Sequence, residues 1–387
     1  MTVLGTSPNA RLIGAGPRGL LLAAGGVALL AGLTGALVLL GVPIPRVTVR
    51  LGAIHGLLMV FGFLGTLVSL ERAVALGRPW GYLAPLASAA GAIALLAGAT
   101  LAAGGLLVVA GLALVAIYVA FDRIERSLHG FVQAVGAAAW LGAAILLAGG
   151  RPVAATVPFL AAFLVFTIVG ERLELSRVTR PPPAARRVFA AACLAFGVGV
   201  VVTLVAPDAG TRLAGAGLIA LAAWLARFDI ARRTVRSTGV TRFIAASLLP
   251  GYLWLAVGGA VWLVLGSPLP VPAYDAAIHA LFLGFAISMV FGHAPVILPA
   301  VLRLPLPYRP RFYAHLGLLH AGLVIRIVAG DALAIPGAWR LGGVLNVLAL
   351  LLFLASSVVA VLGGLRAGAT RRADDGAPRS TSDVSGG

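Results

Sequence analysis

Twelve apolar stretches of membrane-spanning length follow one another along the chain, and they constrain its fold more than any other feature. A helix needs about 20 mostly apolar residues to cross the hydrocarbon core of a bilayer. The stretches that meet or approach this length are residues 19–41, 51–70, 82–100, 103–121, 130–149, 153–170, 187–206, 212–227, 243–266, 275–301, 312–330 and 340–365. We therefore predict an all-α, polytopic membrane bundle of about twelve transmembrane helices, with the lipid bilayer as its surroundings.

The composition agrees with a bilayer protein and excludes an ordinary soluble domain. Hydrophobic residues make up 60% of the 387 residues and charged residues 11%, whereas a soluble domain carries about 25% charged residues. The formal net charge is +17, and the 29 basic residues are all arginines. These arginines are dispersed between the apolar stretches and form no basic domain, so we predict no nucleic-acid partner.

The arginines also predict the orientation of the chain. With twelve helices, 23 of the 29 arginines fall on the side of the N-terminus, and cytoplasmic loops carry the excess of basic residues. Both termini are therefore predicted to be cytoplasmic, in a bacterial-type inner (cell) membrane. We predict a cytoplasmic N-terminal segment at residues 1–18, a transmembrane domain at 19–366 and a disordered cytoplasmic tail at 367–387.

Two short segments resemble each other. Residues 63–72 read FLGTLVSLER and residues 163–172 read FLVFTIVGER, at the ends of the second and sixth helices. This spacing of four helices favours three four-helix pseudo-repeats. We interpret the two Glu-Arg pairs in these segments as helix-end ion pairs with snorkelling side chains at the cytoplasmic interface.

Histidines inside the helices are the main candidate site residues, because polar groups in a membrane are costly. At 1.5 Å per residue, His55 and His279 lie at one depth, near the outer ends of the second and tenth helices. Two imidazoles in this arrangement can hold a haem iron from both sides. Arg326 lies in the same layer and needs an anion, which is either a haem propionate or a carboxylate, Asp275 or Asp331.

Deeper in the predicted membrane, His293 and His320 fall at a similar depth. They are candidates for a second metal site, for copper or another haem, since imidazole suits both. A single buried histidine is more often a hydrogen-bonded packing residue, so this interpretation stays open beside the metal site. The roles of His129 and His315 are also left open.

Small residues surround the first histidine pair. Gly52, Gly56, Gly62 and Gly284 would leave room for a flat cofactor between helices. They could equally serve close packing of the helices, for which membrane proteins use small residues.

The segments around these histidines resemble a known family. The chain reads HGLLMVFGF from His55, HALFLGF from His279 and FGHAPVILP around His293. These segments are similar to the NnrS family, twelve-helix proteins that resemble the catalytic subunit of haem-copper oxidases. The matching positions are His55 and Gly62-Phe63 in the early motif, and His279, Ala280, Leu281 and Gly284 in the late one.

The resemblance implies haem and copper binding and a role in nitric-oxide metabolism or tolerance. The chain departs from the family at Leu57 and Leu58, where the early motif has a second histidine and a glutamate. It also has no adjacent His-His pair, so a copper site with three histidines is not evident. The match is detailed for the second and tenth helices and rests on topology elsewhere.

Three hypotheses follow. The first is a haem b-binding membrane protein, with His55 and His279 as axial ligands and Arg326 on a propionate. It would act in electron transfer with an unidentified redox partner or in nitric-oxide handling, and as an oxidoreductase if it is an enzyme. The alternative is a twelve-helix secondary transporter, in which His279, His293 and Asp275 line a proton or substrate path. The third is a structural or assembly protein of the membrane without a site.

Overall fold

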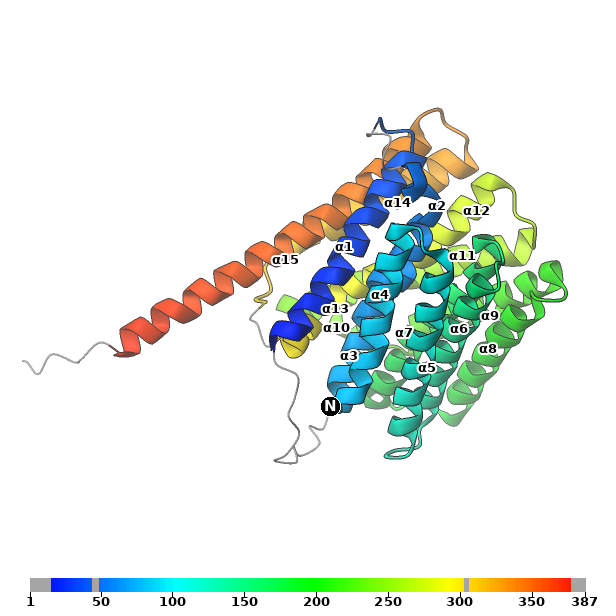
Figure 1. Cartoon of the computed structure of the whole chain (residues 1–387). Helices are drawn as coiled ribbons and strands as arrows, with labels where there is room; N and C mark the ends of the chain where they lie inside the picture. Colours follow the sequence, from blue (N-terminus) through cyan, green and yellow to red (C-terminus); the bar gives the residue numbers. More distant parts are fainter. Residues whose placement is uncertain (1–14, 44–48, 303–305, 377–387) are drawn as a thin grey trace, which may run out of the picture.

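The fold is a bundle of long helices (Figure 1). The computed structural model of the protein describes residues 15–43, 49–302 and 306–376. Within these residues there is no strand, and twelve helices are long and apolar enough to cross a membrane. The prediction of an all-α, polytopic membrane bundle is therefore confirmed.

Several of the twelve spans consist of more than one helical element. In chain order the elements are α1 (Ala15–Leu39), α2 (Val49–Leu57), η2 (Leu58–Gly65), α3 (Thr66–Leu76), η3 (Pro79–Tyr82), α4 (Leu83–Ala97), α5 (Thr100–Asp122), α6 (Leu128–Ala148), α7 (Val153–Ser176), η4 (Arg177–Thr179), α8 (Pro183–Val202), α9 (Pro207–Phe228), α10 (Ala231–Thr234), α11 (Gly239–Leu265), α12 (Val271–His279), η5 (Ala280–Ile287), α13 (Ser288–Leu302), α14 (Phe312–Leu323), η6 (Val324–Ala332) and α15 (Ala338–Gly376). The second, tenth and eleventh spans are thus α2–η2–α3, α12–η5–α13 and α14–η6.

Local sequence sets many of the helix boundaries. Gly77 and Gly98 end α3 and α4 in the left-handed conformation, which glycine adopts without a Cβ clash. Pro183 and Pro207 begin α8 and α9. Proline has no backbone N–H group, and in the first turn of a helix that group would have no acceptor within the helix, so nothing is lost there. The short connections between spans follow from these signals.

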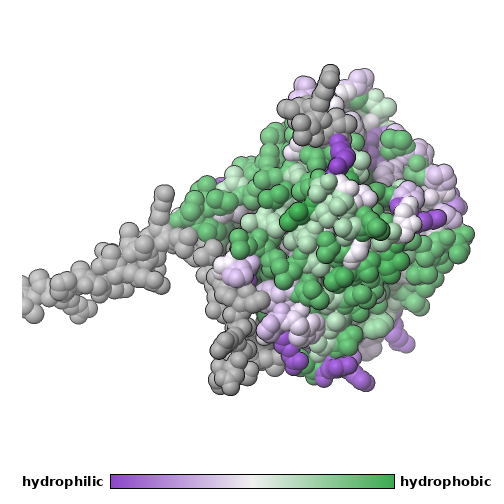
Figure 2. Space-filling model, in the orientation of Figure 1, coloured by the Kyte–Doolittle hydropathy of each residue, from purple (hydrophilic) through white to green (hydrophobic). Residues whose placement is uncertain are grey.

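The second, sixth and tenth spans lie at the centre of the bundle. In an apolar stretch of 18 residues within each span, the share of buried residues is 61% for Arg50–Leu76, 72% for Val153–Thr179 and 61% for Val271–Val301, the highest values of the twelve. Apolar side chains cover the flank of the molecule that faces the viewer in Figure 2, and hydrophilic ones gather toward its ends. A spacing of four between the central spans agrees with three four-helix units, although the repeat itself stays a prediction.

Two ends of the bundle can be distinguished. We call the end where α2 and α12 begin the outer end, and the end where α3 and α7 finish the inner end, which the arginines predict to be cytoplasmic. At the outer end, Arg50 donates to the carbonyls of Leu95 and Leu96, in the last turn of α4, at 2.9 Å each. Arg212 likewise donates to carbonyls at the end of α11. Arginine stabilises the negative end of a helix dipole, which accounts for these two cations on the side with few arginines.

The last helix is longer than predicted. It continues to Gly376, whereas the sequence predicted a disordered tail from residue 367. Alanine and arginine are frequent in this stretch and are strong helix formers, and the first proline beyond it is Pro378. The remainder of that tail, 377–387, and residues 1–14 of the predicted N-terminal segment lie outside the described residues.

Candidate functional site

The outer half of the bundle contains a cavity, which we call the outer cavity. Its volume is about 280 Å³, and it lies among α1, α2, η2, α7, α12, η5, η6 and α15. Ligand pockets are commonly about 300–1,000 Å³, so the cavity is close to the lower end of that range. Most of the wall is apolar, and its polar lining consists of His55, Tyr274, His279, Arg326 and Asn346.

The two predicted haem ligands both line this cavity, and both rings are oriented by a bond from Nδ1. His55 Nδ1 lies 2.7 Å from the carbonyl oxygen of Gly32. His279 Nδ1 lies 2.8 Å from the carbonyl oxygen of Asp275 and 3.2 Å from its carboxylate. Among the hydrogen bonds of the described residues, none involves the Nε2 atom of either ring. A ring that donates from Nδ1 keeps the Nε2 lone pair free, which is the arrangement of a metal-binding histidine with its outer-shell partner.

Asp275 is the centre of a polar network behind His279. Arg326 donates to its carboxylate from Nε at 2.7 Å and from Nη2 at 2.6 Å, and the Trp339 indole donates at 3.0 Å. The side chains of Arg326 and Asp275 are 8% and 14% exposed. Asp275 is therefore the anion that pairs with Arg326. It is one of the two carboxylates, Asp275 and Asp331, that the sequence left open as its partner.

The network gives Arg326 an indirect connection to the cavity histidine. Its charge is balanced within the protein, so no external anion is needed to explain its burial. This connection was not predicted from the sequence, although the spacing from Asp275 to His279 is four residues and places both on one face of a helix. The role of Trp339 had no signal in the sequence, because 60 residues separate it from His279.

Three π-helical segments accompany the candidate residues. They are Leu58–Gly65, three residues after His55; Ala280–Ile287, directly after His279; and Val324–Ala332, which contains Arg326. In π-helices the hydrogen bonds run from i to i+5, and such segments occur frequently at functional sites. The sequence did not reveal them, because apolar composition does not distinguish a π-helical segment from an α-helical one in a membrane span.

The glycines near this cavity divide into two kinds. Gly52 and Gly56 line the cavity, and a Cβ on Gly56 would meet nothing within 4 Å. Gly62 instead packs against Ala28 and Ala92, and Gly284 packs against the indole of Trp254. A Cβ on Gly52 would meet Leu39 at 3.3 Å. Gly56 therefore contributes open space at the cavity, and the other three glycines serve close packing of the helices.

The structure does not bring His293 and His320 together as a metal site. His293 Nδ1 lies 2.7 Å from the carbonyl of Met289, and its Nε2 lies 3.1 Å from Arg172. His320 accepts from the Trp254 indole at 3.0 Å and pairs with Ser288 at 3.1 Å. Both rings have hydrogen-bond partners at both nitrogens, so the residues do not fit a copper ion without turning.

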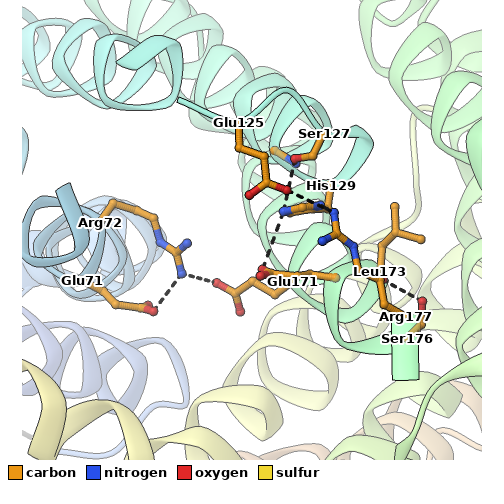
Figure 3. A network of polar contacts seen from close by, with 11 residues as sticks. Glu71, Arg72, Glu125, Ser127, His129, Glu171, Leu173, Ser176 and Arg177 are labelled. Carbon is orange, nitrogen blue, oxygen red and sulfur yellow. Dashed lines mark hydrogen bonds and ion pairs between the residues drawn. The ribbon is translucent and has the colours of Figure 1, made fainter. Parts of the chain in front are cut away.

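The described ranges also contain no group of three or more His, Cys, Asp and Glu side chains that could hold a metal ion. The two remaining histidines have different surroundings. His315 is 1% exposed among four phenylalanines, and neither ring nitrogen has a partner there. His129 contacts Ser127 and Arg177 at the inner end (Figure 3).

The two Glu-Arg segments form ion pairs between helices, with Arg72, Glu71 and Glu171 partly buried and Arg172 buried. Arg72 Nη2 bridges Glu71 at 2.8 Å and Glu171 at 2.7 Å, which joins the second and sixth spans (Figure 3). Arg172 is 3% exposed and pairs with Asp229 at 3.1 Å. Ion pairs form at both segments, but Glu171 pairs with Arg72 of the other segment and Arg172 pairs with Asp229. The position of these groups at the membrane interface stays a prediction.

Comparisons with known proteins give one match. A family model described as Domain of unknown function (DUF8744) matches residues 18–362. No curated protein matches the chain, and no solved structure matches it.

Proposed function

The chain belongs to the DUF8744 family, and from the geometry of its outer cavity we propose that it is a haem-binding membrane protein. In this proposal His55 and His279 would hold the iron of a haem b at the outer cavity, and the haem would supply one-electron redox chemistry. The observation that carries it is the pair of rings on two central spans. Each ring is held at Nδ1, has no hydrogen bond at Nε2 among the described residues, and lines the same cavity.

Arg326 has a different role in this proposal from the propionate contact predicted from the sequence. It holds the Asp275 carboxylate, and that carboxylate holds the His279 ring. Carboxylate partners of this kind fix the orientation of a ligating histidine and raise its basicity. Arg326 and Asp275 are therefore positioning residues.

Two histidine ligands favour electron transfer over nitric-oxide handling. A haem iron with both axial positions taken by protein side chains exchanges electrons without an open coordination site, whereas binding of a small gas molecule needs one position free. Nitric-oxide metabolism or tolerance, which the resemblance to the NnrS family implies, would require one of the two rings to move away. Copper is not part of the proposal, because His293 and His320 are engaged with protein partners.

The experiment is optical spectroscopy of the purified full-length chain in detergent, supplied with haemin. We expect a reduced-minus-oxidised spectrum of b-type haem at one haem per chain, and its loss in His55→Ala and in His279→Ala. His129→Ala is the matched control, because this histidine lies at the inner end and outside the outer cavity. A chain that takes up no haem, or variants that keep an unchanged spectrum, would refute the proposal.

A second candidate function is secondary transport, and one observation favours it. Charged side chains pair between the second and sixth spans and between the sixth span and the end of the eighth, as they do along the substrate or proton path of transporters. The same spectroscopic experiment separates the two functions, because a transporter of this kind would bind no haem.

A further inference from the structure

A second cavity lies in the inner half of the bundle, and we call it the inner cavity. Its volume is about 160 Å³ and it is partly open, and its wall comes from α1, η2, α3, α7, η5, α13 and α15. The wall is apolar apart from a few side chains at Glu71, Thr167, Glu171, His293 and Ser357. Leu64 lines both cavities, so the two adjoin each other.

The charges at this cavity do not balance. Glu71 and Glu171 both line it, and within the described part of the chain Arg72 is the cation paired with each of them. Arg72 contacts one carboxylate oxygen, Oε1, of each glutamate (Figure 3). No hydrogen bond among the described residues reaches the Oε2 atoms. Two carboxylates and one guanidinium leave one excess negative charge, which is costly in an apolar setting.

The neighbouring charged groups do not supply the missing positive charge. Arg172 is already paired with Asp229 at 3.1 Å. His293 donates from Nδ1 to a carbonyl and faces the Arg172 guanidinium, a donor, with Nε2. Since Nε2 must accept this bond, the ring is neutral.

An unpartnered hydroxyl also points to a ligand. Ser357 is 8% exposed and lines the inner cavity. The buried helical serines Ser69 and Ser247 bond to the carbonyl four residues before them. For Ser357, in contrast, the described residues provide no hydrogen-bond partner. A buried hydroxyl is normally satisfied, so this group is free to bond to a molecule in the cavity.

From these observations we propose that the inner cavity binds an amphipathic organic cation. The apolar wall takes the hydrocarbon body of the ligand. The positive centre lies against the free oxygens of Glu71 and Glu171 and neutralises the excess charge. The proposal does not depend on haem, because Glu71, Glu171 and Ser357 do not line the outer cavity. The competing possibility is that a proton on one glutamate balances the charge and the cavity has no preference for cations.

The experiment compares two ions of matched size and opposite charge on the full-length chain in detergent. Isothermal titration calorimetry would measure the binding of tetraphenylphosphonium and of tetraphenylborate, with empty micelles as the blank. We expect one tetraphenylphosphonium per chain and no saturable binding of tetraphenylborate. Equal binding of the two ions, or of neither, would overturn the proposal without recourse to any variant.

Variants then locate the site. In Glu71→Gln and Glu171→Gln the excess charge is removed, and we expect the dissociation constant of tetraphenylphosphonium to rise at least tenfold, which corresponds to about 1.4 kcal/mol. The matched control is Glu125→Gln, because the Glu125 side chain is 70% exposed and has only a 3.8 Å contact to Arg177. An unchanged dissociation constant in both cavity variants would contradict the assignment.

Discussion

The ion pair between Asp275 and Arg326 allows the sharpest test of the structure. Both groups are almost completely buried, at 14% and 8% exposure, and two hydrogen bonds of 2.7 and 2.6 Å join them. Removal of one partner leaves the other as an uncompensated charge. We therefore expect Asp275→Asn and Arg326→Gln each to lower the free energy of unfolding by about 3–5 kcal/mol.

The double variant, Asp275→Asn with Arg326→Gln, gives the decisive comparison. It removes both charges, so its cost should be well below the sum of the two single costs, with a coupling energy of roughly 2 kcal/mol or more. Unfolding in mixed detergent micelles, followed by circular dichroism, measures all three free energies. Single costs below about 1 kcal/mol, in the range of exposed pairs, or costs that simply add, would refute the argument that burial makes this pair strong.

Two further predictions concern the orientation and the packing of the spans. The background for the first test is the chain with its one cysteine replaced by alanine. Ser237 is predicted to be cytoplasmic and Ser267 to lie on the other side, so on intact cells Ser237→Cys should be protected from a membrane-impermeant maleimide and Ser267→Cys should react. The reverse pattern would show that the topology is inverted. Gly65→Ala should lower the melting temperature because a Cβ there would overlap the Trp140 ring, at a cost of about 1–3 kcal/mol. The control is Gly105→Ala, where a Cβ meets nothing within 4 Å; it should leave the free energy of unfolding unchanged or raise it by about 0.5–1 kcal/mol. Equal losses in the two variants would contradict the close contact between Gly65 and Trp140.

The sequence alone was enough to predict the class of fold and the depth of single residues. Length and hydropathy of a stretch are one-dimensional properties, and a bilayer acts on them directly, so twelve spans could be counted without knowledge of their contacts. The same reasoning predicted His55 and His279 at one depth, since depth depends only on the rise per residue. Both residues line the outer cavity.

The partners of the buried polar groups were decided only by the tertiary structure. Asp275 was one of several possible anions for Arg326, and the sequence could not choose among them. His293 and His320 were predicted to share one depth, as His55 and His279 were. Their rings, however, bond to Arg172, Trp254 and Ser288.

The outer and inner cavities are likewise absent from the sequence, because each is formed by side chains from six or more separate helical elements. An apolar stretch specifies that a helix lies in the membrane, and it leaves open which way the helix is rotated and which neighbour it meets. Rotation and neighbours are set by packing between helices that are distant in the chain. They determine whether a buried histidine keeps a free nitrogen, as at His55, or has both nitrogens bonded, as at His320.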